Sequence, residues 1–193
     1  EAETMPPFTF DTFPELETER LLLQRILPTD AADWARLFGH PDVTAYLVDI
    51  EENAGDEAHA AEIIAWADEI FARRSGIRWA VTLKPEGRLI GSCGFHLYSA
   101  ANRRAEIGYE LHVDYWRQGI MTEALRAVLR FCFDALELRR VEADVTAGNQ
   151  ASAGLLRSLG FVQEGTWRER VFARGQFHDL WQFGLLEREY RAR

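Results

Sequence analysis

The chain has 193 residues, of which 47% are hydrophobic and 12% aromatic, which fits one domain with a substantial core and excludes an intrinsically disordered chain. Its formal net charge of −9 disfavours nucleic-acid binding, because proteins bind the phosphate backbone through Lys and Arg. That charge would suit a cationic partner, or it could serve only solubility. No apolar run reaches the roughly 18 residues of a membrane helix. The N-terminus also lacks a signal-peptide pattern, so we expect a cytoplasmic protein without a membrane partner.

Cysteine and histidine show no pattern of a disulfide framework or a metal site. Cys93 and Cys132 lie among apolar neighbours, so we expect both to be small buried side chains. The five histidines lack any ligand spacing such as H-x-x-x-H. The sequence therefore predicts no bound metal.

The first half of the chain predicts an arm followed mainly by helices. Residues 1–15 are rich in Pro and Thr without a lasting period, so we expect an extended arm before a single domain over 16–193. The domain opens with a strand over 20–25, a helix over 31–38, a helical turn over 42–47 and a helix over 57–74.

The second half begins with strand periodicity. Strands are predicted over 77–84, 89–98 and 106–113, close enough in sequence to form an antiparallel meander. A helix over 121–136, a strand over 141–145, a helix over 150–159 and a hairpin over 161–174 and 177–186 complete the order. The unit 106–145 predicts one parallel, right-handed crossover. The expected fold is α+β (mixed α/β), with a central mixed, mostly antiparallel twisted sheet and helices on both faces.

The turn Trp116–Thr122 is the first candidate for a binding site. It lies between a predicted strand and a predicted helix, so backbone N–H groups and the partial positive charge of the helix N-terminus could face an anion such as phosphate. Gly119 would let the ligand approach the backbone, and Arg117 and Gln118 add side-chain donors. Neither G-x-x-x-x-G-K-[ST] nor G-x-G-x-x-G is present, so the turn alone could be a plain connection.

Several segments in register resemble the GNAT superfamily of acyl-CoA-dependent N-acetyltransferases, and more closely its RimJ/RimL-like branch, named for enzymes that acetylate N-termini of ribosomal proteins. They are ETERLLLQR (17–25), IGSCGF (90–95), AEIGYEL (105–111), YWRQGIMTEAL (115–125), NQASAGLLRSLGF (149–161) and FHDLWQFGLLEREY (177–190). The superfamily's pyrophosphate loop reads Q/R-x-x-G-x-G/A. Here Trp116 takes its first position and Met121 its last, so only Gly119 fits the strict form. The resemblance implies the acyl-CoA N-acyltransferase fold and acetyl-CoA as the cofactor.

The resemblance also implies which residues meet the cofactor. The pyrophosphate would lie on Arg117, Gln118, Gly119, Ile120, Met121 and Thr122. In the family, pantetheine pairs with free backbone groups of the preceding strand, which fall here at Leu111, His112 and Val113. Asn149 aligns with an asparagine that faces the cofactor, although it could be a simple N-cap. Ser152, one turn later, could meet the pantetheine or the sulfur, or could be a solvated helix residue.

Acetyl transfer requires a neutral amine, donors to the carbonyl oxygen and an acid for the leaving thiolate. A backbone N–H near Leu111 is the expected oxyanion donor. Glu110 is the first candidate for the base and Glu106, on the same strand face, the second, although both could belong to a solvated face. Tyr109 and Ser152 are candidates for the acid, and Tyr109 could equally be packed in the core.

The function predicted from the sequence is acetyl-CoA-dependent acetylation of a primary amine. The acceptor could be a protein N-terminal α-amine or a small-molecule amine of the aminoglycoside, polyamine or amino-acid-like kind, and a non-catalytic CoA-binding module is a further alternative. Neutralising an α-amine at pH 7 costs about 1.4 kcal/mol against about 4.6 kcal/mol for lysine, which favours α-amines. We expect acceptor contacts in the helical stretch before the meander and in the last hairpin, which could also pair with another chain to form a homodimer. Acidic residues that could attract a cation are Asp42, Asp49, Glu51, Glu52 and Asp56.

Overall fold

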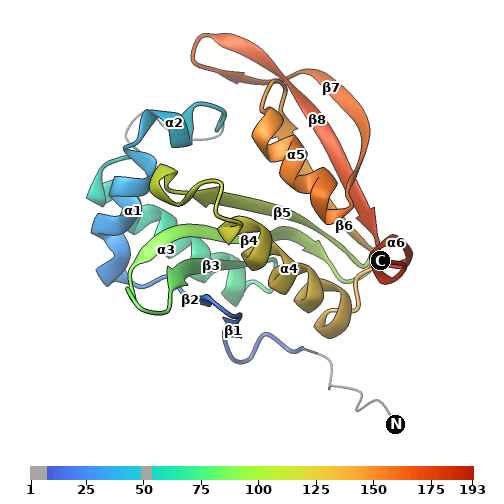
Figure 1. Ribbon diagram of the computed structural model, residues 1–193, viewed down its shortest axis with the longest axis horizontal. Coiled ribbons are helices and arrows are strands. Elements are labelled where there is room, and N and C mark those ends of the chain that lie inside the picture. The colour runs from blue at the N-terminus through green and yellow to red at the C-terminus, as the bar shows by residue number, and fades with distance from the viewer. Residues whose placement is uncertain (1–7, 49–53) are drawn as a thin grey trace.

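The computed structural model describes residues 8–48 and 54–193, whose strands form one eight-stranded sheet in the order β1-β2-β3-β4-β5-β6-β8-β7 (Figure 1). The strands are β1 (Leu16–Glu17), β2 (Leu21–Arg25), β3 (Ile77–Leu83), β4 (Leu89–Ser99), β5 (Arg104–Leu111), β6 (Arg140–Thr146), β7 (Val162–Ala173) and β8 (Gln176–Leu186). The helices are α1 (Ala31–Phe38), α2 (Pro41–Thr44), α3 (Glu57–Ala72), α4 (Ile120–Arg130), α5 (Gln150–Leu159) and α6 (Glu187–Arg191). Every strand pair is antiparallel except β5–β6, which confirms the mixed, mostly antiparallel sheet.

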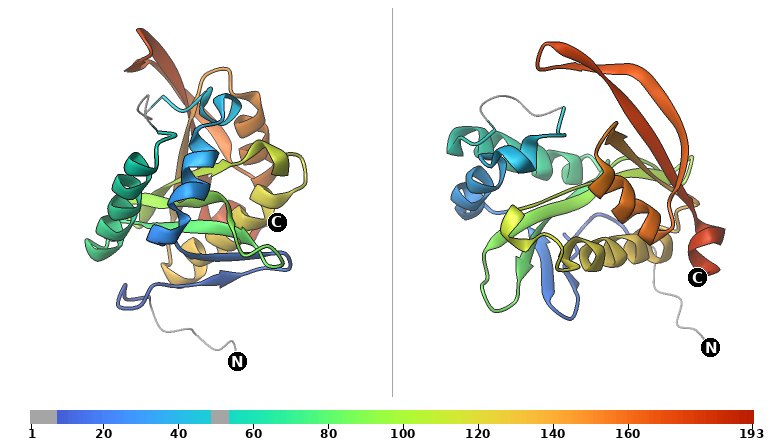
Figure 2. Two further views of the ribbon diagram at one scale, coloured as in Figure 1. Left: turned by 90° about the vertical axis from the view of Figure 1, so that its left-hand side faces the viewer. Right: turned by 45° about the horizontal axis from the view of Figure 1, so that its top comes forward.

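Helices cover both faces of the sheet, as the sequence predicted (Figure 2). Successive residues of β3 show the division: Val81 packs with α4 and α5 in the larger core, whereas Ala80 packs with α1 and α3 in the smaller one. The apolar stripe of α4 is buried, and each fully buried Leu or Val side chain contributes about 1.5–3 kcal/mol of transfer free energy. The sheet is therefore rigidly supported where it carries the site.

Three differences between the predicted and the observed elements bear on the site or on the last hairpin. The strand predicted over 106–113 ends at Leu111. The His112 N–H still donates to Ile90 O, but Val113–Tyr115 then turns away as a 3₁₀-helix. The helix predicted over 121–136 becomes a π-helix at Phe131–Ala135. The last hairpin turns through two residues, Arg174 and Gly175, both of which have positive φ, as a tight hairpin requires.

The arm is not separate from the domain in its described part. Phe8 and Phe13 pack against the larger core, and Phe10 is a buried member of it. The Phe8 N–H also donates to Ala135 O at 3.3 Å. Residues 8–15 therefore contribute to folding although they form no helix or strand of their own.

The parallel pair β5–β6 is short and opens into a gap. Arg104, Ala105 and Glu106 pair with Arg140, Val141 and Glu142. Beyond these residues both strands continue without pairing to each other, while β6 stays paired with β8 along its whole length. The split separates β1–β5 from β6, β8 and β7, and Figure 1 shows β6 and β8 turning away from β5.

Candidate active site

The loop between β5 and α4 has the geometry of an anion site. Gly119 has φ 72° and stands at the N-cap of α4, so the first N–H groups of the helix point out of the loop. A Cβ at Gly119 would have only Arg20 Nη2 near it, at 3.6 Å. The space beside this backbone is therefore open, and the approach of a ligand to Gly119 stays a prediction.

The loop is held by contacts from β2 and the residues just before it. The Arg20 guanidinium donates to Gln118 O at 2.9 Å and to Glu123 Oε2 at 2.6 Å. Although burial opposes ionisation of Glu123, hydrogen bonds from Thr18 and Arg20 hold the pKa of its carboxyl below the usual range. Because Arg20 balances this carboxylate, the first turn of α4 remains attractive to a phosphate.

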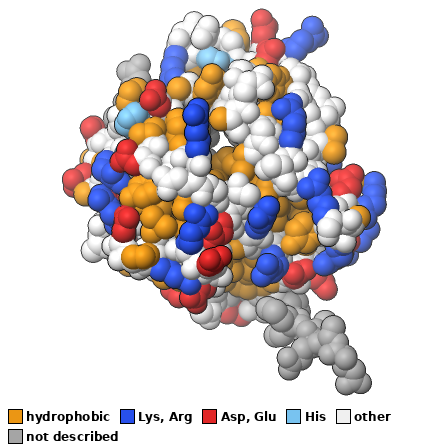
Figure 3. Space-filling model, viewed as in Figure 1, with side chains coloured by type: hydrophobic (Ala, Val, Ile, Leu, Met, Phe, Trp, Pro, Cys, Tyr) orange, Lys and Arg blue, Asp and Glu red, His pale blue; other side chains and the backbone are white. Residues whose placement is uncertain are grey.

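The face formed by α4 and α5 is basic although the whole chain is acidic (Figure 3). Its exposed arginines are Arg117, Arg126, Arg130 and Arg157. Such a surface would neutralise the phosphates of a nucleotide-containing cofactor bound at the loop.

Free backbone groups of β5 face the gap. The His112 N–H donates to Ile90 O, and alternate residues of an antiparallel strand direct their backbone groups to the same neighbour. Glu110 and Gly108 therefore bond toward β4, whereas Tyr109 and Leu111 direct N–H and C=O groups into the gap. The backbone groups expected to be free at Leu111–Val113 are therefore those of Tyr109 and Leu111. Of these, Leu111 O already accepts a hydrogen bond from the Trp116 indole at 2.7 Å.

Tyr109 and α5 meet on the α4–α5 side of the gap. Tyr109 Oη and Ser152 Oγ are 2.7 Å apart, and burial raises the pKa of the phenol to about 12. Asn149 Oδ1 accepts a hydrogen bond from the Ser152 N–H at 3.1 Å, so Asn149 is an N-cap. Tyr109 also packs against the core, which leaves its hydroxyl as the group available at the gap.

Glu110 lies on the opposite face of the sheet in a buried ion pair. Its Oε2 accepts hydrogen bonds from Arg78 Nη2 and from the Ser92 hydroxyl, the latter at 2.6 Å. The side chains of Glu110 and Arg78 are only 13% and 7% exposed. The carboxylate predicted as base is therefore already neutralised by a partner within the chain.

Three further carboxylates share this face, two of them on β6. Glu106 is 3.2 Å from His96 Nε2 and in register with Glu142. Asp144, two residues further along β6, lies just beyond the point where β5 and β6 separate. Burial, together with the charges of Glu106 and Glu142, raises the pKa of Asp144 to about 6, despite opposing effects of Arg170 and His96.

Contacts between distant segments form an arch over this face. Arg174, at the tip of the β7–β8 hairpin, donates to Ala45 O at 3.0 Å and to Thr44 O at 2.6 Å (Figure 1). The Thr146 hydroxyl at the end of β6 donates to Tyr46 O at 2.7 Å. Of the acidic residues predicted to attract a cation, Asp49, Glu51 and Glu52 lie outside the described residues.

These features match a known family. A model of the acetyltransferase (GNAT) domain matches residues 20–162, well over half of the chain. The chain belongs to this family. It is 36% identical over 175 residues to the Bacillus subtilis uncharacterized N-acetyltransferase YoaA, covering 91% of this chain and 98% of that protein. The protein is thus an N-acetyltransferase, which takes its acetyl group from acetyl-CoA and transfers it to an amine.

Two further comparisons extend the likeness to the predicted branch. The ribosomal-protein-serine acetyltransferase of Escherichia coli is 32% identical over 95 residues, 49% of this chain and 53% of that protein. Mycobacterium smegmatis RimJ, solved in complex with CoA-disulfide, has the same fold, with a TM-score of 0.79 and 23% identity over 93% of this chain and 88% of that one. No helix within residues 8–48 and 54–193 is long and apolar enough to cross a membrane.

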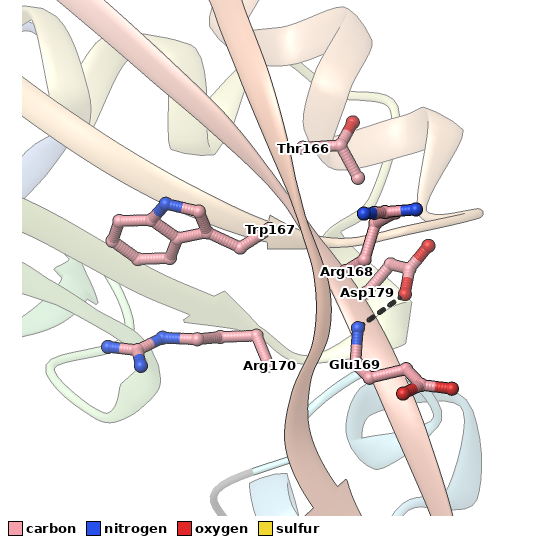
Figure 4. A pocket seen from close by; sticks show the side chains of 6 residues that line it. All are labelled: Thr166, Trp167, Arg168, Glu169, Arg170 and Asp179. Carbon is pink, nitrogen blue, oxygen red and sulfur yellow. Dashed lines mark hydrogen bonds between the residues drawn. The ribbon is translucent and has the colours of Figure 1, made fainter.

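An open hollow of about 940 Å³ lies on the β7–β8 hairpin of the acetyltransferase, away from the gap between β5 and β6. Figure 4 shows the six residues that line it: Thr166, Trp167, Arg168, Glu169, Arg170 and Asp179. A bulge between Trp167 and Val171 forms it, with the Glu169 N–H donating to Asp179 Oδ1 at 2.7 Å. The Arg170 guanidinium lies 4.6 Å from the Trp167 ring centroid. Because Trp167 pairs with Leu180 and Leu180 with Thr146, the Trp167 side of the bulge borders the face that carries Asp144.

Sequence reasoning missed Asp144 and Arg78. Both are polar residues of short strands, and each alternates with apolar neighbours that the cores bury. The alternation of β6 could have placed Asp144 on the face of Glu106, since the parallel crossover was predicted. The partnership of Arg78 with Glu110 depends on the register of β3, β4 and β5, which the sequence does not specify.

Proposed function

We propose that this acetyltransferase acts on an α-amine at a protein N-terminus. The Escherichia coli relative is named a ribosomal-protein-serine acetyltransferase, and RimL, a solved structure of the same fold, is named a ribosomal L7/L12 alpha-N-protein acetyltransferase. The observation that carries the proposal is Asp144, a carboxyl with a pKa raised to about 6 at the edge of the gap. A base of this pKa is ionised at neutral pH and still accepts a proton more readily than an ordinary carboxylate.

The cofactor would lie along the loop and the gap. The loop 117–122 and the exposed arginines of the α4–α5 face would hold the phosphates. The free C=O group of Tyr109 would accept a hydrogen bond from pantetheine as it would from an added strand, while Leu111 O is already bonded to Trp116. In this position acetyl-CoA supplies the thioester carbonyl that the amine attacks and the sulfur that leaves.

Asp144 is the better-placed base because it has no ion-pair partner among the described residues, unlike Glu110. Its carboxylate takes one proton from the acceptor ammonium, directly or through a water. The neutral amine can then form the new C–N bond as the C–S bond breaks, and the proton that the nitrogen still has to lose neutralises the departing thiolate. Glu110 as the base remains a prediction from the sequence, and we assign it a positioning role.

Two groups of Tyr109 serve the reacting carbonyl and sulfur. Its N–H, with that of Leu111, donates to the carbonyl oxygen as negative charge develops there. Its phenol donates a hydrogen bond to the departing sulfur. Full proton transfer from a phenol of pKa about 12 to a thiolate near 8.5 would cost about 4.8 kcal/mol, so a hydrogen bond is the better role.

Proton transfer to this carboxylate also costs less from an α-amine than from a lysine side chain, by an amount that depends only on the two amines. Transfer to this carboxylate is uphill by about 2 pKa units, or 2.7 kcal/mol, from an α-ammonium near 8. From a lysine near 10.4 it is uphill by about 4.4 units, or 6 kcal/mol. The difference of roughly 3 kcal/mol, about 200-fold in rate, selects N-terminal amines.

The test is a thiol-release assay with acetyl-CoA against N-terminal peptides of ribosomal proteins, the same peptides with a blocked N-terminus and one internal lysine, and a panel of small amines. We expect release with free N-terminal peptides, confirmed by mass spectrometry of the acetylated α-amine. Preference for an aminoglycoside or polyamine would assign a small-molecule acceptor. Acetyl-CoA binding without release with any amine would indicate a non-catalytic module.

A further inference from the structure

The Arg78 guanidinium is buried yet only partly used. Its side chain is 7% exposed; Nε donates to Ser92 Oγ at 3.0 Å and Nη2 donates to Glu110 Oε2. Within residues 8–48 and 54–193, Nη1 has no hydrogen-bond partner. Nη1 is therefore a cationic donor that is held in place and still able to bond to an acceptor on a bound molecule.

The unpaired nitrogen lies over Gly108, on the face of the sheet that carries the carboxylates. A Cβ at Gly108 would be 3.0 Å from Arg78 Nη1 and 3.8 Å from His96 Cε1, and would meet no other atom within 4 Å. The missing side chain thus leaves a small space between Arg78 and His96. An atom of an acceptor could enter it and meet Nη1.

This space lies beside Asp144. Glu106 is in register with Glu142, so Gly108 and Asp144 are counterparts on the two strands where they separate. Parallel strands lie about 4.8 Å apart and these two diverge, so the backbones at Gly108 and Asp144 flank a space of one strand spacing or slightly more. One face of the gap therefore offers a carboxylate on β6 and a fixed N–H donor above β5.

We propose that Arg78 is a specificity-determining residue that recognises an oxygen attached next to the α-carbon of the acceptor. Asp144 faces the amine. Arg78 Nη1 donates to an oxygen of the carbonyl or carboxylate group that is bonded to the α-carbon. The acceptor class is then an α-aminoacyl group, which a peptide N-terminus and a free amino acid share. This inference rests on the proposed function and narrows its acceptor.

The surrounding contacts explain why the donor stays in place. Ser92 and Glu110 hold two of the three guanidinium nitrogens, so Nη1 is aimed by a rigid fork and not by a mobile side chain. Glu110 also balances the charge, which lets a carbonyl bind as well as a carboxylate. An alkylamine would offer this N–H no acceptor, and sites that hydrogen-bond a substrate oxygen discriminate against analogues that lack it.

The experiment compares two acceptors in two enzymes. The acceptors are alanyl-alanine amide and its analogue in which the first peptide carbonyl is reduced to CH₂, with free alanine as a third arm. The enzymes are the wild type and Arg78→Lys, which keeps the charge near Glu110 but loses the fork. We expect the wild type to prefer the carbonyl acceptor, and Arg78→Lys to reduce that preference about 10- to 100-fold. Acceptor pKa cancels in this ratio of ratios.

Control variants distinguish a loss of folding, or a failure of the proposed function, from a failure of the role given to Arg78. Arg73→Lys changes an exposed arginine paired with Glu69 and should leave the ratio unchanged. If Arg78→Lys does not fold, the double variant Arg78→Met with Glu110→Gln removes both charges together and should show the same loss of preference. The relative rates with free alanine and with the dipeptide show whether Arg78 binds a carboxylate or a peptide carbonyl, and either result supports the inference.

An unchanged ratio in both variants would overturn the role of Arg78 while leaving the acetyltransferase reaction intact. A wild type that accepts the reduced analogue equally well would do the same. A wild type that acetylates no α-amine at all would instead refute the proposed function, and this inference with it.

Discussion

The two sides of the split sheet are built in different ways. The proposed cofactor side consists of one contiguous loop, backbone groups of β5 and the N-terminal ends of α4 and α5. The acceptor side uses side chains from β3, β4, β5 and β6, bordered by the β7–β8 hairpin. Backbone recognition needs few particular residues, whereas acceptor recognition depends on each side chain and on strand register. The sequence therefore reports the cofactor more clearly than the acceptor.

The two sides also differ in charge. Exposed arginines surround the proposed cofactor loop, whereas the acceptor face carries four carboxylates, of which Glu110 is paired with Arg78 and Glu142 with Arg104 and Arg140. The net charge of −9 conceals this division. Such a separation attracts a polyanionic cofactor to one side and a cationic amine to the other. The following variants test each side separately, beginning with the largest expected effect.

Gly119→Glu should abolish binding of acetyl-CoA while leaving the acceptor side intact. The substitution places a carboxylate in the anion site and strains a residue with φ 72°. Calorimetric titration with acetyl-CoA measures the effect. The matched control is Gly175→Glu, which has φ 77° and no atom within 4 Å of the new Cβ, so it carries the same charge and strain on the hairpin tip. Equal affinity in both variants would mean that the loop does not bind the pyrophosphate.

Asp144→Asn should lower kcat by about 10²–10⁴ without changing acetyl-CoA affinity, because it removes the base but no part of the cofactor side. The pKa of Asp144 is raised to about 6, so its basic form is present above that pH and is lost as pH falls through it. The wild-type pH–rate profile should therefore decline below about pH 6. The variant should lack this acidic limb.

Glu110→Gln is the comparison for that result. Its carboxylate already accepts from Arg78 and Ser92, so the variant should lose less activity than Asp144→Asn and keep the acidic limb. It should also unfold at a lower temperature, because Arg78 is left buried without its counter-charge. A larger loss in Glu110→Gln, with the limb gone, would return the base to the residue that the sequence favoured.

The same contrast explains what sequence reasoning could reach. Helix and strand periods predicted the order of elements, the parallel crossover and the loop at Gly119, since each depends on neighbours in the chain. The sequence did not predict the end of β5, because the last hydrogen bond of the strand joins His112 to Ile90 in another strand before the chain turns. Asp144 and Arg78 escaped for the same reason, as their roles follow from the register of several strands. Local sequence specifies the elements, and nonlocal pairing specifies the acceptor site.

Tyr109→Phe tests the proposed hydrogen bond from the Tyr109 phenol to the departing sulfur of CoA, where the cofactor side meets the acceptor side. Loss of the hydroxyl removes one hydrogen bond to the departing thiolate and frees Ser152 Oγ, so we expect kcat to fall about 10-fold with unchanged acetyl-CoA affinity. Ser152→Ala should have a smaller effect, because it leaves the phenol in place. Steady-state kinetics of both variants provides the measurement. If Ser152→Ala were the more damaging, the serine and not the phenol would contact the sulfur.

Arg174→Ala should have the smallest effect, and it should fall on the acceptor side alone. Its guanidinium joins the hairpin tip to the carbonyls of Thr44 and Ala45, and exposed contacts of this kind contribute little individually. Without them the arch should loosen, and KM for the peptide acceptor should change a few-fold at constant kcat. Arg168→Ala, which lies on the same hairpin and makes no ion pair among the described residues, is the control. Equal kinetics in the two variants would show that the arch does not position the acceptor, whereas altered acetyl-CoA affinity would show that the two sides of the gap are coupled.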